Sequence, residues 1–507
     1  MTDLAFASAR MTFAALMLLA IGFSTPAPAQ NDKAQNDRQI SAIFADWMRD
    51  QRAPGLCWGV VTRAGLVQSG CEGVQDVESA TPANADTAFR IASMSKAFTA
   101  YGILTLADAG RLRLDDKAAV HVPELAGWAP DVTVAQLLHH MAGFVTDDPW
   151  GDRQQVLTEA EFTAMLKAGV PFHRAPGLAY EYSNFGYATL GRIVGNVSGK
   201  PYQAFVREQV FVPLGMVSTT YEVRDVPAAR LAKGYRWEGQ TWVPEPVMRD
   251  GAFGAMGGVV TTANDYAKWM AHLLGGWPAM TEPGARLRAK DTGARLRAKD
   301  KAALLRAMGN GGGQPHERPR PGVDAPGCRM MVIYAAGLVS GRDCLLGRVL
   351  FHSGGYPGYG SHMLLLPDAG VGIFAFSNRT YAAPVAPVWD VAGLLQRDGR
   401  IVADAVPMSD ALAAGYAAAQ QIWASGRIDA VPDMLAMNML MDQSAPRWAA
   451  QLAQLKADNG LCDTASPIRP EGALSGRFLW RCTHGRISGQ LLLAPTRQIQ
   501  ALRLTRN

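Results

Sequence analysis

The 507-residue sequence lacks the features that mark several broad classes of protein. It has no dense tract of lysine and arginine, and its net charge of +5 is small for this length, which disfavours nucleic-acid binding. Only six cysteines occur, none in a Cys-x-x-Cys spacing, which disfavours a metal site. No apolar run reaches the about 20 residues that a membrane-spanning helix needs. We therefore expect no metal, no cofactor, no nucleic acid and no membrane span in the mature chain.

The length and composition favour a large folded protein. Hydrophobic residues make up 48% of the chain and charged residues 18%, which allows an extensive core. The chain is also longer than one ordinary domain. We predict a main domain over residues 30–400 and a small domain over residues 401–507, preceded by a removable segment over residues 1–29. The sequence gives no indication of the oligomeric state.

The first 29 residues read as an export signal. Arg10 precedes an apolar run over Met11–Phe23, and Ala27-Pro28-Ala29 offers a small-x-small cleavage site. We expect a soluble protein that begins near Gln30 and is periplasmic or secreted. The alternative is that the apolar run remains attached as an anchor.

The cysteines are consistent with export, because disulfides form and persist in oxidising compartments. Two nearest-neighbour pairs flank stretches that read as hairpins, where opposed strand positions bring Cβ atoms within disulfide reach. Other pairings are possible, since six cysteines can connect in several ways. The predicted disulfides are Cys57–Cys71, Cys328–Cys344 and Cys462–Cys482.

The order of the predicted elements indicates an α/β fold. Leu56–Arg63 and Leu66–Gly73 read as a strand hairpin. Gly309–Pro326 is rich in glycine and proline and reads as a loop. Four further strands are predicted near residue 350: Met330–Val339, Arg348–His352, Ser361–Leu366 and Val371–Ser377. The segments between read mostly as helices, so the simplest topology is one antiparallel sheet flanked by helices.

Two other regions have distinct patterns. Asp410–Trp423 and Ala445–Asn459 read as helices and are followed by short predicted strands, which indicates a small α+β domain. Gly284–Asp291, with the sequence GARLRAKD, recurs unchanged at Gly293–Asp300. One duplication is not a repeat architecture, and we interpret it as an insertion in a basic surface segment.

The stretch from Phe89 to Lys96 places a serine and a lysine three residues apart. At this spacing Ser93 and Lys96 share one face of a helix. A serine hydroxyl needs a base to take its proton, and a lysine can be that base when burial lowers its pKa. The start of a helix also favours developing negative charge. The alternative is an ordinary helix that Ser93 or Ser95 caps.

A second candidate element, Tyr182 and Asn184, lies just before a predicted helix. The Tyr182 phenol could relay a proton beside a cationic lysine, and the Asn184 amide could hydrogen-bond a substrate amide and the lysine. The alternative is a plain turn that Asn184 caps.

The third candidate element, His352-Ser353-Gly354-Gly355, ends a predicted strand. Glycines at this position allow a substrate to approach the backbone closely, which makes Gly354 and Gly355 candidate substrate-binding residues. The Gly355 N–H could complete an oxyanion hole with the Ser93 N–H.

Together these elements resemble the serine β-lactamase-like hydrolases, which include class C β-lactamases, D-alanyl-D-alanine carboxypeptidases, D-aminopeptidases and related esterases. Ser93-Met94-Ser95-Lys96 is similar to their Ser-x-x-Lys, and Tyr182-Ser183-Asn184 to their Tyr-x-Asn. His352-Ser353-Gly354 is similar to the His-x-Gly variant of their Lys-Thr-Gly. The resemblance runs from Asp37 to Ser377. It implies an α/β core with a helical subdomain and the site between them.

The resemblance also implies an acyl-enzyme mechanism without metal. Ser93 attacks a carbonyl, Lys96 and Tyr182 move the protons, and water then releases the acyl group. The implied substrates are small molecules or peptides, including peptidoglycan-derived ones: D-amino-acid or D-Ala-D-Ala peptides first, or esters. The alternatives are a true class C-like β-lactamase and a protein that binds peptidoglycan or β-lactam without turnover.

Three positions complicate the resemblance. His352 stands where the family has a lysine that attracts substrate carboxylates, and an imidazole is mostly neutral at about pH 7.4, so we expect weaker binding of anionic substrates. Leu138-His139-His140-Met141-Ala142-Gly143 stands where the family more often shows His-Thr-Ser-Gly, and we interpret His140 as structural. We interpret Asp147-Asp148-Pro149-Trp150 as a surface loop rather than the rim of the cleft.

Overall fold

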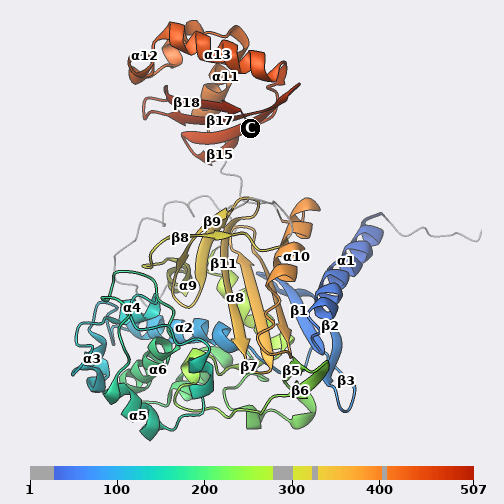
Figure 1. Cartoon of the computed structure of the whole chain (residues 1–507), viewed down its shortest axis with the longest axis vertical. Coiled ribbons are helices and arrows are strands. Elements are labelled where there is room, and N and C mark those ends of the chain that lie inside the picture. The colour runs from blue at the N-terminus through green and yellow to red at the C-terminus, as the bar shows by residue number, and fades with distance from the viewer. Residues whose placement is uncertain (1–27, 278–300, 323–328, 402–407, 507) are drawn as a thin grey trace, which may run out of the picture.

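The computed structural model describes residues 28–277, 301–322, 329–401 and 408–506. Figure 1 shows a main unit and a smaller C-terminal unit, each with its own hydrophobic core. The predicted export signal lies almost wholly outside the described residues, and both copies of the GARLRAKD repeat lie outside them. Within the described ranges, no helix is long and apolar enough to cross a membrane.

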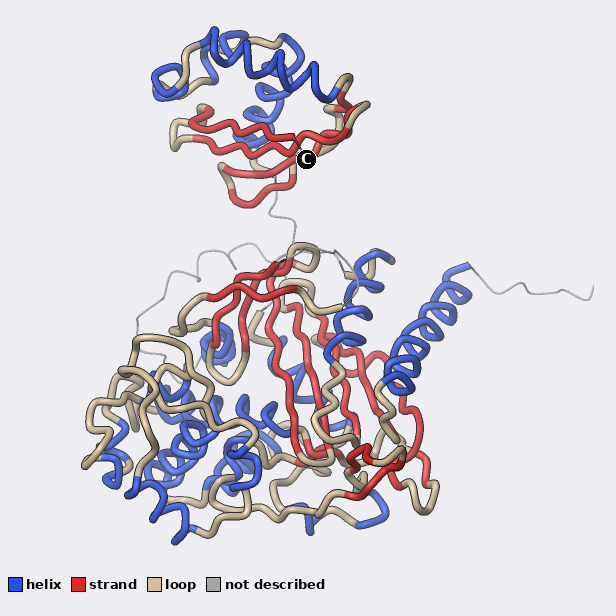
Figure 2. Tube along the Cα trace, viewed as in Figure 1, coloured by secondary structure: helices blue, strands red, loops and turns tan. Residues whose placement is uncertain are grey.

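The main unit is built on a nine-stranded antiparallel sheet with the order β3-β2-β1-β13-β12-β11-β10-β9-β8, drawn in red in Figure 2. The N-terminal hairpin pairs directly with the last strand, so the predicted topology is confirmed. The strands are β1 Gly55–Thr62, β2 Gly65–Asp76, β3 Thr81–Pro82, β8 His316–Pro319, β9 Arg329–Tyr334, β10 Val339–Asp343, β11 Gly347–Tyr356, β12 Tyr359–Leu366 and β13 Val371–Ser377.

Helices cover both faces of this sheet. Successive side chains along a strand point to opposite faces, so the apolar strands present apolar side chains on both. On one face, Phe44 of α1 (Pro28–Asp50) stacks on Trp58, and Trp389 of α10 (Val385–Arg397) hydrogen-bonds His362. On the other face, Tyr266 of α8 (Ala263–Leu274) packs on two phenylalanines of β13, Phe374 and Phe376. The sheet is therefore buried on both sides at its centre.

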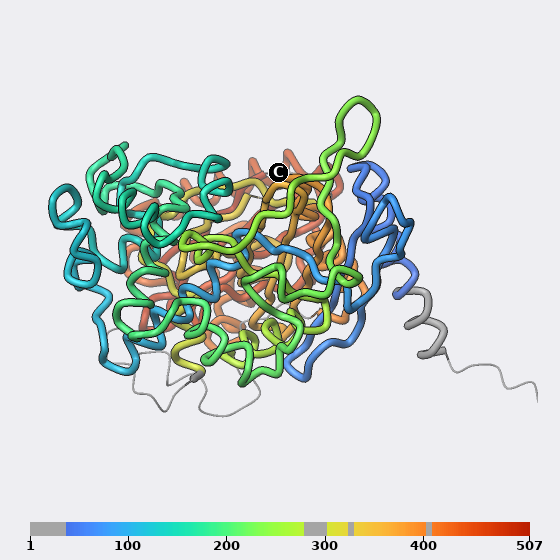
Figure 3. Tube along the Cα trace, turned by 90° about the horizontal axis from the view of Figure 1, so that it is seen from below, coloured from blue at the N-terminus to red at the C-terminus, as the bar shows by residue number. Residues whose placement is uncertain are grey.

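A helical region lies beside the sheet. In Figures 1 and 3 its segments gather at the end of the main unit away from α1. Its longest helices are α2 Lys96–Asp108, α5 Glu159–Ala168 and α6 Asn184–Ser198. Shorter ones are α3 Ala118–His121, α4 Val134–Leu138, α7 Tyr202–Val206 and α9 Lys301–Gly309. This is the architecture that the family resemblance implies: an antiparallel sheet flanked by helices with a helical subdomain.

The C-terminal unit is a small α+β domain, as predicted. Its strands pair in the order β14-β16-β17-β18, with β15 on β16. The strands are β14 Cys462–Asp463, β15 Arg469–Gly472, β16 Ser475–Cys482, β17 Gly485–Leu493 and β18 Ile499–Arg506. The helices are α11 Asp410–Ser425, α12 Asn438–Asp442 and α13 Ala445–Asn459.

Two of the predicted disulfides are confirmed. Cys57–Cys71 joins directly opposed positions of β1 and β2, and Cys462–Cys482 does the same for β14 and β16. The third predicted pair involves Cys328, which lies outside the described residues.

Some sequence predictions were wrong in detail. The predicted single strand Met330–Val339 is a hairpin, because the chain turns at Gly337, which has a φ of +73°. The predicted loop at 309–326 contains the edge strand β8, which ends in Pro319, a residue that only an edge tolerates. Helix α10 was not predicted.

Candidate active site

Ser93 lies in a tight turn that the fold holds in an uncommon conformation. The turn is a 3₁₀ helix, Ala92–Ser95, placed by the short pairing of β4 (Phe89–Arg90) with β7 (Val260–Thr261). Ala92 has a φ of +49°, a conformation that non-glycine residues seldom adopt and that often marks functional sites. Neither serine makes a side-chain cap at the starts of this turn and of α2, so the capping alternative does not account for them.

Strand β11 touches this turn at Gly354. A Cβ on Gly354 would lie 2.2 Å from the Ile91 carbonyl oxygen and 2.3 Å from Ser361 Oγ. The glycine therefore lets the strand approach the turn that carries Ser93. This contact helps to position the turn, and the role of Gly354 in substrate approach stays a prediction.

Lys96 is completely buried, and its ammonium group has three hydrogen-bond partners. Nζ donates to Ser93 Oγ at 3.0 Å, to Asn184 Oδ1 at 2.6 Å and to the Met256 carbonyl at 2.7 Å. An ammonium has three N–H donors, so all are used. If the group loses one proton, the amide and carbonyl oxygens still accept two N–H bonds, and the freed lone pair faces Ser93.

The environment of Lys96 lowers its pKa to about 8. Burial is the main cause, because it disfavours the charged form, and the carboxylates of Asp152, Asp148 and Asp147 oppose it. At this pKa about a tenth of the molecules carry a neutral lysine near pH 7. Lys96 can therefore take a proton from Ser93 without a large energetic cost.

Tyr182 donates a hydrogen bond from its hydroxyl to Ser93 Oγ at 2.8 Å. Its ring also lies 4.9 Å from Lys96 Nζ, measured to the ring centroid. Burial raises the pKa of Tyr182 well above its ordinary value, so the group is a neutral phenol. It can donate a proton to a leaving group and recover one from Lys96.

Asn184 is the first residue of α6, and Ser183 rather than Asn184 caps this helix. The amide oxygen of Asn184 accepts from Lys96, and its Nδ2 donates to Asp148 at 3.3 Å. The two carboxylate oxygens of Asp147 accept from the backbone N–H groups of Asn184 and Phe185, at 2.6 and 2.7 Å. The structure thus brings Ser93, Lys96, Tyr182 and Asn184 together.

The interpretation of Asp147-Asp148-Pro149-Trp150 as a surface loop is wrong for Asp147, whereas the other three residues are exposed. Asp147 is buried because it binds the free N–H groups at the start of α6. The same loop carries Asp152, which is 1% exposed and accepts a hydrogen bond from Tyr381 at 3.0 Å. Sequence reasoning missed Asp152 and Tyr381, which no motif spacing connects.

His352 is 5% exposed and has a partner at each ring nitrogen. Nδ1 lies 2.6 Å from the Ser353 carbonyl, so it carries the proton, and Nε2 accepts from the Tyr334 hydroxyl at 2.9 Å. Burial and the charge of Lys96 lower the pKa of His352 to about 3. The ring is neutral, and the structure does not place it as an open cation for a substrate.

His140 lies behind Tyr182, with ring centroids 4.4 Å apart. Its Nδ1 accepts from the Ser183 N–H at 3.1 Å, which fixes the turn before α6. Burial and the charge of Lys96 hold the pKa of His140 well below its ordinary value. It makes no hydrogen bond to Ser93.

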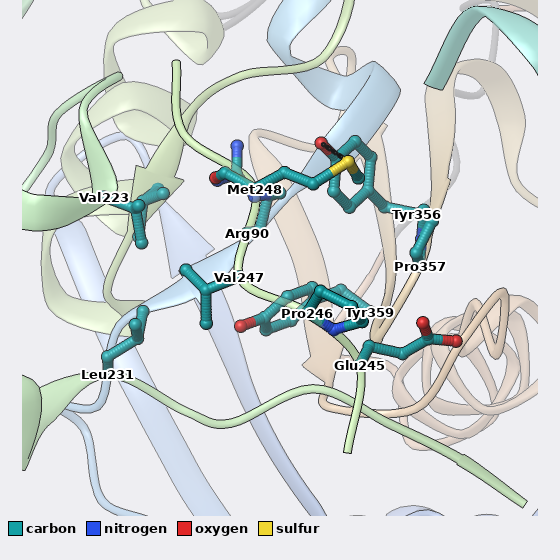
Figure 4. A pocket seen from close by; sticks show the side chains of 11 residues that line it. Arg90, Val223, Leu231, Glu245, Pro246, Val247, Met248, Tyr356, Pro357 and Tyr359 are labelled. Atoms are coloured by element: carbon teal, nitrogen blue, oxygen red, sulfur yellow. Dashed lines mark hydrogen bonds between the residues drawn. The ribbon is translucent and has the colours of Figure 1, made fainter. Parts of the chain in front are cut away.

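A small hollow lies next to the end of β11, as Figure 4 shows. Its residues include Tyr356, Met248 and the buried Arg90, and its volume is about 10 Å³. That is room for about one water molecule, so this hollow is too small for a substrate. Within the described parts of the chain, no group of three or more His, Cys, Asp or Glu residues could hold a metal ion.

The fold of this chain is similar to the folds of two solved protein structures. The chain resembles the structure of the octameric penicillin-binding protein homologue from Pyrococcus abyssi, with a TM-score of 0.57 and 18% identity over 92% of this chain and 98% of that one. It also resembles a class C β-lactamase mutant, with a TM-score of 0.56 and 19% identity over 72% of this chain and 98% of that one. These likenesses concern the fold.

Sequence relatives cover less of the chain. Protein flp from Staphylococcus aureus (strain MW2) is 27% identical over 359 residues, which is 69% of this chain and 64% of that protein. Beta-lactamase-like protein 2 from Dictyostelium discoideum is 27% identical over 245 residues, 46% of this chain and 44% of that protein. The chain thus spans less than two thirds of either relative.

The family model described as Beta-lactamase matches residues 40–397, which include Ser93, Lys96, Tyr182, Asn184 and the segment His352–Gly355. The match takes in the whole nine-stranded sheet and the helices beside it. The chain therefore belongs to the Beta-lactamase family.

Proposed function

We propose that this protein is a serine hydrolase that forms an acyl-enzyme on Ser93. The observation that carries the proposal is the convergence on Ser93 Oγ of Tyr182 Oη at 2.8 Å and Lys96 Nζ at 3.0 Å. A hydroxyl with a buried, pKa-lowered lysine as its base is an activated nucleophile. The family membership supports the same chemistry.

Acylation would begin with transfer of the Ser93 proton to neutral Lys96. The Oγ–carbon bond forms, and the Ser93 and Gly355 N–H groups hold the carbonyl oxygen as it gains charge. The bond from the carbonyl carbon to the leaving group then breaks, and Tyr182 gives that group a proton and takes one from Lys96. In deacylation neutral Lys96 takes a proton from water as the water oxygen bonds to the carbonyl carbon. The bond between Ser93 Oγ and that carbon then breaks, Ser93 Oγ takes back a proton through Tyr182 and Lys96, and the carboxylic acid is released.

The substrates we propose are D-amino-acid peptides or esters. The penicillin-binding protein homologue and the class C β-lactamase are named for ligands with reactive amide carbonyls, which supports substrates of this kind. Neutral His352 supports amides or esters without a carboxylate beside the scissile bond. Peptidoglycan fragments are one source of D-amino-acid peptides.

We further propose that the protein is exported to the periplasm or secreted. The two disulfides support an oxidising compartment. We place the end of the hydrolase domain near residue 400, because the two hydrophobic cores share no residue and the first ends at Ile401.

Turnover of a mixed panel tests the proposed function: D-Ala-D-Ala peptides, D-aminoacyl amides, short-chain esters and a chromogenic cephalosporin. We expect turnover of a D-amino-acid amide or an ester that Ser93→Ala abolishes. Faster hydrolysis of the cephalosporin than of every other substrate would favour a β-lactamase. Binding without any turnover would favour a non-catalytic protein.

A further inference from the structure

We propose that Asp152 selects substrates whose acyl group carries a protonated amine, with Tyr381 holding the carboxylate in place. The inference rests on the proposed function, because it assigns a substrate class to the same site. It makes the protein an aminopeptidase-like hydrolase, which recognises a free ammonium on the acyl side, rather than a carboxypeptidase, which recognises a carboxylate on the leaving group.

The first argument is position. Gly151 packs on Asn184, since a Cβ on this glycine would lie 2.6 Å from Asn184 Cβ. On the opposite side, the Tyr381 ring lies 2.8 Å from where a Cβ on Gly355 would be. The 3.0 Å hydrogen bond between Tyr381 and Asp152 therefore links the segment that packs on Asn184 with the residue that packs on Gly355.

These two neighbours frame the acyl group in the proposed mechanism. Asn184 binds Lys96, which touches Ser93 Oγ, and Gly355 is the proposed oxyanion donor. A group attached to the carbonyl carbon and lying between them would have the Asp152 carboxylate within reach.

The second argument is charge. Among the described residues only Tyr381 donates to the Asp152 side chain, and it donates to Oδ2. Oδ1 receives no hydrogen bond, although the residue is 1% exposed. A buried carboxylate with one neutral donor is poorly compensated, and burial together with Asp148 raises the pKa of Asp152 to about 7. A bound ammonium would supply the missing donor and the opposite charge, and so favour the ionised carboxylate.

The other two acidic groups of the loop differ from Asp152. Asp147 binds the start of α6 with both oxygens, and Asp148 accepts from Asn184. Lys96 is the positive group whose charge reaches Asp152, and its three N–H donors are taken by other partners. Asp152 is thus the acid of this loop that is buried and has an oxygen without a protein donor among the described residues, whereas Asp148 is exposed.

The third argument is the neutral state of His352, which is buried and bound at both ring nitrogens. A substrate carboxylate near His352 meets no charged imidazole, whereas a substrate cation near Asp152 meets a carboxylate. Complementary charge is a main source of such discrimination.

The test uses two diphenyl phosphonate esters that react with an activated serine: 1-aminoethylphosphonate and its N-acetyl form. In each reaction the Ser93 Oγ–phosphorus bond forms and phenol leaves, so both report the same step. The second-order rate constant of labelling is followed by intact mass at about pH 7. Asp152→Asn is compared with Asp131→Asn, which removes one exposed negative charge elsewhere. A small fluorophosphonate serves as a reactivity reference.

We expect the unaltered protein to react at least about tenfold faster with the amine than with its acetylated form, since one well-placed ion pair supplies that much. Asp152→Asn should lose this preference, and Asp131→Asn should keep it. Equal rates for both esters in the unaltered protein would overturn the inference without any variant. A preference that survives in Asp152→Asn would overturn it too.

The Tyr381→Phe variant tests whether Asp152 determines substrate preference or whether its hydrogen bond to Tyr381 only joins two segments of the chain. It should keep a preference for the amine, whereas a purely structural role predicts that both variants lose reactivity toward both esters alike. Failure of the fluorophosphonate to label Ser93 would instead refute the proposed function, so the two failures are distinguishable.

Discussion

Lys96 Nζ lies closer to Asn184 Oδ1, at 2.6 Å, than to Ser93 Oγ, at 3.0 Å. The neutral amide accepts a hydrogen bond from the ammonium without adding a negative charge that would stabilise the ammonium strongly. Asn184 therefore holds the lysine in place while burial keeps its pKa near 8. Substitutions near Lys96 should therefore shift its pKa upward or downward, depending on the charge that they introduce.

Asn184→Asp should reduce the fraction of molecules in which Lys96 is neutral and able to act as the base. A carboxylate beside Lys96 raises the pKa of the lysine, so a smaller fraction is neutral at about pH 7. We expect the acid limb of the pH–rate profile for Ser93 labelling to move up by about one unit or more, with a rate about tenfold lower at pH 7. Asn196→Asp, an exposed change on the same helix, is the control. An unmoved acid limb would exclude Lys96 as the base.

His352→Lys should act in the opposite direction. A second cation near Lys96 lowers the pKa of Lys96, so the acid limb should move to lower pH. The variant should also gain reactivity toward carboxylate-bearing substrates relative to neutral esters. His484→Lys, exposed in the C-terminal domain, should change neither quantity. Loss of labelling at every pH in a folded His352→Lys protein would contradict this account.

Gly354→Ala should disturb the turn that carries Ser93. The new Cβ would overlap the Ile91 carbonyl and Ser361 Oγ, and overpacking of this kind costs about 1–3 kcal/mol of unfolding free energy. We expect labelling to slow by at least about 100-fold, because a small displacement at a catalytic group has effects of this size. Gly127→Ala, where a Cβ meets open space, should be neutral in both assays.

Removal of each disulfide should destabilise only the unit that contains it. Replacing Cys57 and Cys71 by serine should destabilise the main unit by about 2–4 kcal/mol. Replacing Cys462 and Cys482 should lower the unfolding temperature of the C-terminal domain and leave Ser93 labelling unchanged, since that domain has its own core. Thermal unfolding together with labelling rates checks both. Loss of labelling in the second variant would show that the C-terminal domain supports the site.

Local patterns were enough to predict part of this molecule. The Ser93–Lys96 spacing, the Tyr182 turn and the apolar run of β13 are properties of short segments, so the candidate nucleophile, its candidate base and the sheet could be predicted. The burial of Asp152 and its bond to Tyr381 depend on contacts between residues far apart in sequence, which no local pattern encodes. The environment that keeps His352 neutral could not be predicted from the sequence either, because it depends on burial and on a hydrogen bond with Tyr334.

Strand assignments failed for a related reason. Met330–Val339 reads as one apolar run, and only the turn at Gly337 divides it. β8 has a polar sequence ending in proline, so its pairing with β9 becomes visible only in the folded sheet.

The central claim is that Ser93 is the nucleophile, with Lys96 as its base. Intact mass after reaction with a fluorophosphonate, followed by peptide mapping, tests it most directly. We predict a single adduct on Ser93 in the unaltered protein, none in Ser93→Ala, and labelling slowed by several orders of magnitude in Lys96→Ala and Tyr182→Phe. No adduct, an adduct on another residue, or substrate turnover by Ser93→Ala would contradict the account.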